Sequence, residues 1–138
     1  MIVKDFMTSI IITAETDVLV SDAAKLMAIE RIGSFIVTRS EVLVGLVTRH
    51  DILAARLMSD DTYATLTLEE IMQSPVISIS PDAAIDQLIS LMNQTGNRHV
   101  PVMSGDEVIG IVSSSDVIRV LATVKLLSDG VSSIDEEV

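Results

Sequence analysis

The sequence predicts an α+β protein of two tandem repeats, each with a leading β-run, a helix, two further strands and a second helix. One observation is an internal duplication, because a shift of 65 positions aligns residues 3–53 with residues 68–118 without a gap. Another is that strand-like and helix-like patterns alternate in the same order in both halves. A third is the length of 138 residues, which suits one compact unit and is too short for a catalytic domain plus a regulatory one.

Identical residues at matching positions support the duplication. They include the pairs Met7 and Met72, Asp17 and Asp82, Gly45 and Gly110, and Asp51 and Asp116. We therefore expect two pseudo-symmetric halves that share a core. The expected boundaries are a first repeat at 1–58, a linker at 59–66, a second repeat at 67–127 and an acidic tail at 128–138.

The first elements of each repeat follow from local patterns. Short leading β-runs are expected at Ile11 to Thr13 and at Val76 to Ser78. Residues 16–31 then predict a helix of about three turns. Its apolar face is expected to comprise Val20, Ala23, Ala24, Met27 and Ile29. The corresponding helix of the second repeat is expected to stop at Gly96.

Each repeat continues with a hairpin and a helix. Two β-branched runs surround a polar turn at 39–41, and the pattern recurs around 104–106. The helix that closes the second repeat has apolar residues around more of its circumference than the ~100° stripe that covers one core. We expect a second buried face and self-association as a homodimer. The alternative is that this helix is simply central in the monomer.

Composition excludes several classes of function. Nine basic and twenty acidic residues give a net charge of -11, which repels nucleic acid. One tyrosine, two phenylalanines and no tryptophan offer no platform for stacking bases. The absence of cysteine removes thiolate catalysis, and two histidines argue against a histidine-rich metal site. No apolar run approaches the ~18 residues of a membrane span and no signal peptide is evident, so we expect a soluble, cytoplasmic protein.

Two stretches, GLVTRHDIL at 45–53 and GIVSSSDVI at 110–118, repeat one motif. At a junction of strand and helix, Thr48 or Ser113 suits the N-cap, and Asp51 or Asp116 falls at the third helical position. One interpretation is therefore a capping box, which is purely structural.

The other interpretation is a ligand site. A helix N-terminus directly after a strand presents free amides and a positive dipole end, which suit a phosphate. An acid there repels a bare phosphate but accepts hydrogen bonds from the two adjacent hydroxyls of a ribose. The motif then suits a nucleoside phosphate. The glycine three residues upstream permits close packing or close approach.

The duplicated pattern resembles a pair of cystathionine β-synthase (CBS) domains, the arrangement called a Bateman module. The resemblance covers nearly the whole chain and is closest in NRHVPV and GIVSSSD of the second repeat. It implies two βαββα units packed through their sheets with pseudo-two-fold symmetry. It also implies clefts between them for adenosine-containing ligands, and pairing of modules into a flat disc.

Carried over to this chain, the resemblance implies a set of nucleotide-binding residues. Asp51 and Asp116 would hold ribose hydroxyls, with Thr48 and Ser113 beside the first phosphate. Phosphate contacts would come from Arg98 and His99, and from Arg49 and Ser114 at the mouth of the cleft. The adenine pockets would be lined by Ile11, Ile12, Thr13, Val76, Ile77, Ser78, Gly33, Ser34, Val100 and Pro101.

The two sites are not expected to be equal. The first repeat has Gly33 and Ser34 where the second has Arg98 and His99, which predicts one functional and one vestigial site. Structural alternatives stay open, because Arg98 can pair with Asp106 or Glu107 on the surface. His99 can equally be a structural hydrogen-bonding residue.

No nucleophile with a base, pair of acids in a cleft or metal cluster is visible, so we expect no catalysis and no required cofactor. The expected function is a regulatory module that binds AMP, ADP or ATP, or else NAD or S-adenosylmethionine. Occupancy would shift the arrangement of the halves or of two chains, which an unidentified effector protein reads. The alternatives are an assembly module without ligand and a regulatory subunit of a separate enzyme or transporter.

Overall fold

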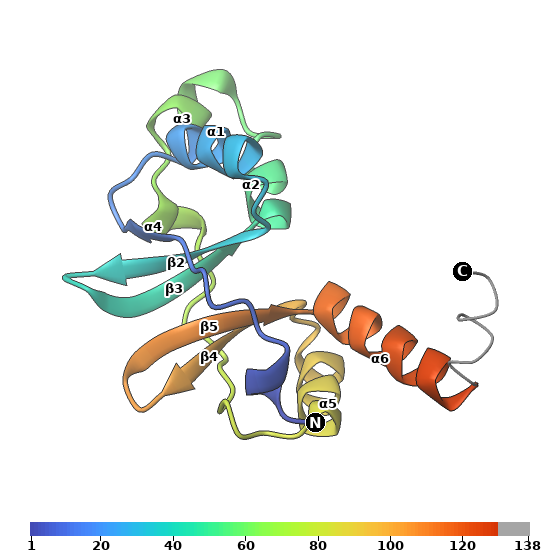
Figure 1. Cartoon of the computed structure of the whole chain (residues 1–138). Coiled ribbons are helices and arrows are strands. Elements are labelled where there is room, and N and C mark those ends of the chain that lie inside the picture. The colour runs from blue at the N-terminus through green and yellow to red at the C-terminus, as the bar shows by residue number, and fades with distance from the viewer. Residues whose placement is uncertain (130–138) are drawn as a thin grey trace.

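The computed structural model describes residues 1–129, and residues 130–138 of the expected acidic tail lie outside this range. Two sheets face each other at the centre and helices cover their outer faces, as the sequence predicts (Figure 1). The first half contains β1 (Thr13–Glu15), α1 (Val20–Glu30), β2 (Ser34–Arg39), β3 (Val42–Thr48) and α2 (Arg49–Ala55). The remaining elements are α3 (Asp60–Thr65), α4 (Leu68–Ile71), α5 (Ile85–Thr95), β4 (His99–Ser104), β5 (Glu107–Ser113) and α6 (Ser114–Ser128).

The predicted helices α1 and α5 form with equal lengths of 11 residues. Each is followed by a residue in the left-handed conformation, Arg31 at φ 54° and Gly96 at φ 75°, and the stop at Gly96 is confirmed. The apolar face of α1 is narrower than expected. Ile29 is 74% exposed because it lies nine positions, or two and a half turns, beyond the buried Val20 and therefore faces the opposite way.

Both predicted hairpins are present. Strands β2 and β3 pair antiparallel around Ser40 and Glu41, whose φ values of 51° and 69° are typical of a type I′ turn. In the hairpin of β4 and β5, Gly105 adopts φ 60°. In each half, helices pack on one face of the hairpin and the other face is turned toward the opposite sheet (Figure 1).

A leading strand forms only in the first half, where β1 covers Thr13–Glu15 and not the expected Ile11 to Thr13, because the pairing with β2 begins at Thr13. There β1 runs parallel to β2, and the N–H of Ile36 donates to the carbonyl of Ile12 at 3.0 Å. The expected strand at Val76 to Ser78 is wrong, because the second half has a single bridge between Ile79 and Val102. Pro101 occupies the position that corresponds to Ile36 and has no N–H to donate, so the ladder cannot extend toward residue 77.

The leading segments cross between the halves. Thr8 exchanges two backbone hydrogen bonds of 2.9 Å with Ile111 of β5, and Gln73 exchanges two of 2.8 and 3.1 Å with Leu46 of β3. The expected shared core is wrong, because buried apolar residues form two clusters: a first core between Val20 and Leu68, and a second core of Val3, Leu88, Val100, Val102, Val112 and Val117. Val3 of the N-terminal turn (Val3–Asp5) is fully buried in the second core. Each half is thus completed by the leading segment of the other.

The span expected as a linker is structured. Residues 60–65 form α3, which lies beside α1, and the following Leu66 is buried in the first core. The backbone N–H of Val20 donates to the carbonyl of Leu66 at 2.8 Å, which ties this span to the start of α1.

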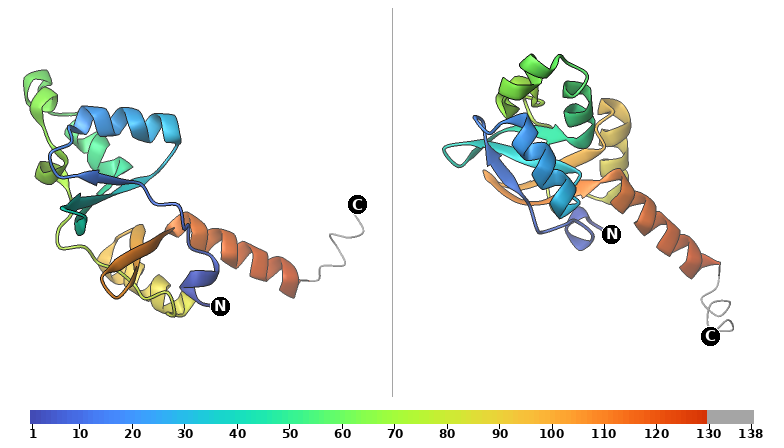
Figure 2. Two further views of the ribbon diagram at one scale, coloured as in Figure 1. Left: turned by 60° about the vertical axis from the view of Figure 1, so that its left-hand side comes forward. Right: turned by 90° about the horizontal axis from the view of Figure 1, so that it is seen from above.

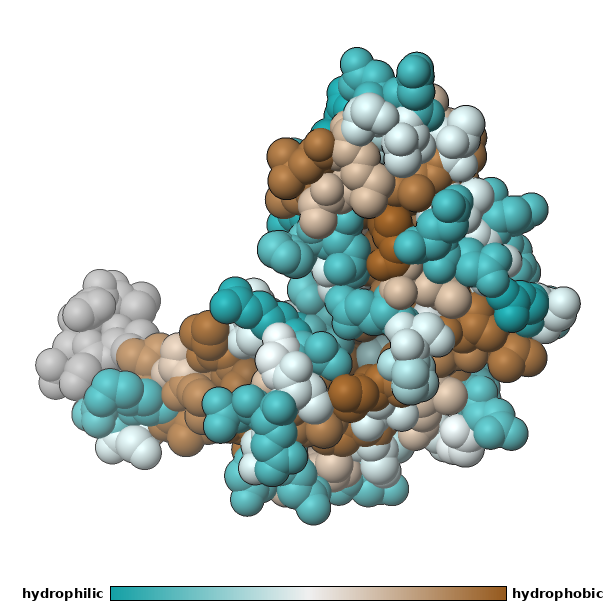
Figure 3. Space-filling view, turned by 180° about the vertical axis from the view of Figure 1, so that it is seen from behind, coloured by the Kyte–Doolittle hydropathy of each residue, from teal (hydrophilic) through white to brown (hydrophobic). Residues whose placement is uncertain are grey.

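Helix α6 projects from the body of the molecule in all ribbon views (Figure 2). Only Asp116, Val117 and Val120 are buried on it. The alternative that α6 is central in the monomer is therefore wrong. Apolar side chains along this helix remain open to solvent, and apolar patches are visible on it from behind (Figure 3).

The crossing relies on close contact between a glycine and a methionine from the other half. A Cβ added at Gly110 would lie 2.6 Å from the Sδ of Met7 and 2.9 Å from the backbone oxygen of Thr8. A Cβ at Gly45 would lie within 2.9 Å of the Cβ of Met72 and closer still to its Sδ. Both glycines were expected to permit close packing, and here they do.

We therefore expect Gly110→Ala to lower the free energy of unfolding by roughly 1–3 kcal/mol, because backbone has to move to admit the methyl group. Gly45→Ala at the matching position should cost a similar amount, since the added methyl group meets both the Sδ and the Cβ of Met72. Urea denaturation measures both variants. A loss below about 0.5 kcal/mol in either variant would contradict this account of the crossing.

Candidate functional site

The two copies of the motif form the same capping box. At the start of α2, the backbone N–H of Thr48 donates to Oδ2 of Asp51 at 2.8 Å, its hydroxyl donates at 3.0 Å, and the N–H of Asp51 donates back to Oγ1 at 3.3 Å. Ser113 and Asp116 repeat these three distances at the start of α6. The capping interpretation is confirmed for both copies, and what surrounds each cap decides whether it has a further role.

The cap of α6 borders a cavity of about 230 Å³, which we call cavity A. This volume approaches the lower end of the roughly 300–1,000 Å³ of small-molecule sites. Both halves contribute to its wall, which includes Ile10, Ile11, Ile12, Ile32, Gly33, Ser34, His99, Ser113 and Asp116. Asp116 is only 8% exposed, so cavity A combines isoleucines from both halves with one buried carboxylate. The other polar groups of its wall are Arg31, His99 and the hydroxyls of Thr8, Ser34 and Ser113.

A second hollow of about 440 Å³, cavity B, lies at the cap of α2. It is bordered by Thr48, Arg49, His50, Gln73, Gly96, Asn97, Arg98 and His99. Two arginines in one hollow contrast with the net charge of -11 of the whole chain. Cavity B is therefore a locally basic region on a protein whose overall charge repels anions.

His99 borders both cavities. A Cβ added at Gly33 would lie 2.9 Å from its Nε2, so the absence of a side chain at Gly33 lets the imidazole lie against the backbone of the first half. Burial lowers the pKa of His99 below 6.5; Asp116 acts to raise it and Arg49 to lower it. The neutral imidazole is thus favoured, and its ring forms the partition between the two cavities.

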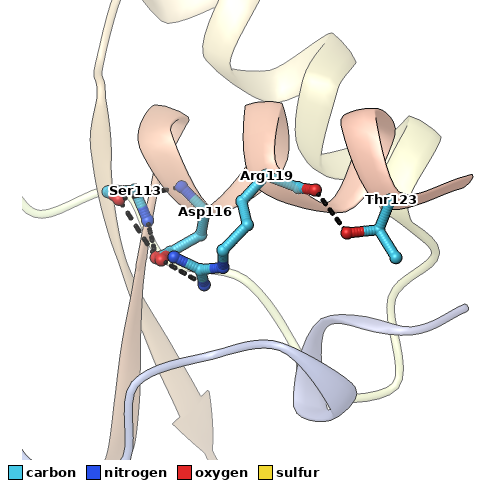
Figure 4. A network of polar contacts seen from close by, with 4 residues as sticks. All are labelled: Ser113, Asp116, Arg119 and Thr123. Carbon is cyan, nitrogen blue, oxygen red and sulfur yellow. Dashed lines mark hydrogen bonds and ion pairs between the residues drawn. The ribbon is translucent and has the colours of Figure 1, made fainter. Parts of the chain in front are cut away.

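The two aspartates differ beyond their caps. Gln73 donates its side-chain amide to Oδ2 of Asp51 at 3.1 Å, and Asp51 borders neither cavity. Asp116 instead receives Nη2 of Arg119 on Oδ1 at 2.9 Å (Figure 4). The aspartate of the motif therefore borders a cavity in the second repeat and contacts a glutamine in the first.

The structure brings about half of the predicted site residues together. Ile11, Ile12, Gly33, Ser34, His99, Ser113 and Asp116 border cavity A, and Thr48, Arg49, Arg98 and again His99 border cavity B. Arg98 makes no ion pair with Asp106 or Glu107 among the four ion pairs found within residues 1–129.

The other predicted site residues border neither cavity. They are Asp51, Thr13, Val76, Ile77, Ser78, Val100, Pro101 and Ser114. Val100 and Pro101 are fully buried, so β4 turns them away from both hollows. Ile77 and Ser78 are exposed because their segment is not held as a strand against β4.

Sequence reasoning missed several residues of the two walls. Thr8, Ile10, Arg31 and Ile32 border cavity A, and Gln73 and Asn97 border cavity B. Thr8 and Gln73 occupy matching positions of the two repeats, and each reaches its cavity through the crossing of the leading segments. No local sequence pattern predicts that crossing, although the identity of Met7 and Met72 indicated that the two segments are equivalent.

Two further classes of site are absent from the described part of the chain. Within residues 1–129, no cluster of three or more side chains is arranged to ligate a metal ion. No helix there combines the length and the apolar composition needed to cross a membrane.

Comparison with known proteins agrees with this geometry. The family model described as CBS domain matches residues 3–58 and again residues 68–123. The chain belongs to the CBS-domain family. Its two domains stand in tandem, and the matched spans coincide with the duplication.

Individual CBS-domain proteins resemble the chain over most of its length. CBS domain-containing protein YhcV of Bacillus subtilis is 29% identical over 83% of this chain and 81% of its own length. The CBS domain pair of protein MJ0100, solved in complex with 5′-methylthioadenosine and S-adenosyl-L-methionine, superposes with a TM-score of 0.80 at 30% identity, covering 89% of this chain and 97% of that one. The hexameric CBS-CP12 protein from bloom-forming cyanobacteria has a TM-score of 0.79 at 26% identity, covering 99% and 83%.

The lowered pKa of His99 predicts a pH dependence of stability. The folded protein binds the proton of His99 less tightly than the unfolded chain does. The free energy of unfolding is therefore not reduced by His99 above about pH 6.5, and it falls as the pH is lowered from that value through the pKa of the folded protein. Urea denaturation at about pH 7.5 and 5.5 should show a smaller loss of stability for His99→Gln than for the wild type.

The other histidine supplies the control for that measurement. His50→Gln removes an exposed imidazole that borders cavity B alone. Equal losses on acidification for the wild type and His99→Gln would contradict the assignment to His99.

Proposed function

We propose that the chain is a non-catalytic regulatory module that binds an adenosine-containing ligand in cavity A, with its charged tail toward cavity B. The observation that carries this proposal is the buried carboxylate of Asp116 on the wall of a cavity that six isoleucines line. A buried charge that is not fully enclosed by its own chain is expensive to keep, and it offers a strong acceptor to a ligand with paired hydroxyl donors.

The chemistry of the walls supports the orientation. Isoleucines from both halves suit the faces of a purine, Asp116 suits the ribose, and Arg49 and Arg98 suit phosphates or a carboxylate. The neighbouring CBS pair of MJ0100 carries 5′-methylthioadenosine and S-adenosyl-L-methionine. We infer the same ligand class here, with AMP, ADP, ATP and NAD as further candidates because of the two arginines.

A bound ligand can change the arrangement of the two halves because both halves contribute to the wall of cavity A. Cavity A joins the segment 31–34 of the first half to His99 and Asp116 of the second. A ligand that contacts both sides therefore favours one relative arrangement of the halves. We infer that an effector protein in the cytoplasm reads this change.

A second candidate function is assembly. On α6, large apolar residues are exposed, among them Ile118 at 67% and Leu127 at 62%. Contiguous exposed apolar surface marks an interaction site, and the related CBS-CP12 protein is hexameric. We infer that α6 packs against a second copy of the chain, whether or not a ligand is bound.

Thermal unfolding tests ligand binding directly. A ligand at about 100 times its dissociation constant adds about 2.7 kcal/mol to the free energy of unfolding and raises the midpoint. AMP, ADP, ATP, NAD and S-adenosylmethionine should be compared, and at least one should raise the midpoint. If no ligand raises the midpoint, the assembly function replaces the proposed ligand-binding function.

The two aspartates provide matched variants for the site itself. Asp116→Ala should weaken binding of the active ligand at least about tenfold, since it removes a charged acceptor. Asp51→Ala removes the same two side-chain capping bonds, those that Oδ2 accepts, at a position that borders neither cavity, so it should lower stability to a similar extent while leaving affinity unchanged. Isothermal titration calorimetry measures both. Equal losses of affinity, or none at Asp116, would contradict the assignment.

A further inference from the structure

The carboxylate of Asp116 is engaged on both oxygens. Oδ2 accepts the N–H and the hydroxyl of Ser113, at 2.8 and 3.0 Å. Oδ1 accepts Nη2 of Arg119 at 2.9 Å (Figure 4). The bonds to Ser113 define the start of α6 and cannot be given up without fraying the helix. The only oxygen that can be offered to a ligand is thus the one that Arg119 contacts.

Arg119 and Asp116 differ sharply in burial. The side chain of Asp116 is 11% exposed, whereas that of Arg119 is 65% exposed and reaches the carboxylate from one turn further along α6. A guanidinium in solvent loses little when it leaves, because water replaces its partner. The carboxylate, by contrast, needs a new donor as soon as Arg119 leaves.

The first repeat lacks this contact. Ala54 stands at the position that corresponds to Arg119, three residues after Asp51. No described residue donates to Oδ1 of Asp51. The arginine is therefore present only where the aspartate borders cavity A.

We propose that Arg119 is a specificity-determining residue that holds Oδ1 of Asp116 and is displaced by the ribose hydroxyls of the ligand. This inference rests on the proposed function of cavity A. Displacement is favourable only for a ligand that returns hydrogen-bond donors to Oδ1. A nucleoside that lacks the 2′- and 3′-hydroxyls cannot replace the guanidinium of Arg119 on Oδ1. The ion pair then stays in place and the nucleoside is rejected.

The decisive probe is adenosine, which has no charge, because removal of a cation weakens the binding of any anion for unrelated reasons. Arg119→Met keeps a good helix former and removes the competitor for Oδ1. We expect adenosine to bind this variant about two- to fivefold more tightly than the wild type, as the loss of a largely exposed ion pair predicts. Isothermal titration calorimetry of the full chain gives both dissociation constants.

Two controls isolate the effect. Lys125→Met removes one cation from the same helix, where Lys125 pairs with Asp129 instead, and should leave the affinity for adenosine unchanged. For 2′,3′-dideoxyadenosine, Arg119→Met should give no gain, because this ligand lacks the adjacent 2′- and 3′-hydroxyls that adenosine offers Asp116. The effect of Arg119→Met on the binding of adenosine, minus its effect on the binding of the dideoxy compound, measures the coupling free energy between Arg119 and the 2′- and 3′-hydroxyls.

The remaining outcomes overturn the inference. Weaker binding of adenosine by Arg119→Met would make Arg119 a ligand contact, and unchanged binding would mean that the arginine and the ribose share Oδ1. An equal gain with the dideoxy compound would show that Arg119 blocks cavity A without regard to the ribose. Failure of adenosine to bind either protein would also reject the inference, and the proposed function fails with it only if the charged ligands give no thermal shift.

Discussion

The structure depends on the reciprocal crossing of its two leading segments. Thr8 pairs with β5 and Gln73 with β3, while Met7 and Met72 pack where Gly110 and Gly45 leave room for them. Because each core is finished by residues of the other half, the two halves cannot move independently by large amounts. The crossing also brings residues 8–12 to the wall of cavity A and Gln73 to the wall of cavity B. Hydrophobic packing, backbone pairing and the shape of the cavities thus have one common origin.

The duplication produces two halves of similar fold in which different residues surround the two capping boxes. The capping boxes agree in all three distances, yet one aspartate meets Gln73 and the other meets cavity A and Arg119. The inequality comes from residues outside the motif. Pro101 in place of Ile36 removes a strand, and His99 in place of Ser34 supplies the partition between the cavities. A repeated motif therefore specifies how a helix begins, and its neighbours specify whether that beginning is also a binding site.

Much of the fold follows from local signals, and most of the remainder depends on contacts between distant residues. The period of the apolar residues, the turn residues at 39–41 and the helix stop at Gly96 each act within a few positions, so the sequence alone predicts them. The missing strand at Val76 to Ser78 could have been anticipated from Pro101, once its alignment with Ile36 was considered. The placement of Ile10, Thr8 and Gln73 at the cavities could not, because it results from segments that pair with the opposite half. The spacing of three positions between Asp116 and Arg119 on a helix is a local signal for their ion pair, but nothing in the sequence shows that this pair lies at the wall of a cavity.

The burial of Val3 in the second core has a consequence for how the protein is made. Residues 3–8 are translated about a hundred positions before their partners on β5. This segment has to wait, with Val3, Phe6 and Met7 uncovered, until β5 has been synthesised. The buried residues of the first core all lie between positions 20 and 68, so this core can close well before that moment. Translation in one direction therefore imposes an order of assembly in which residues 3–8 are among the last of this fold to find their place.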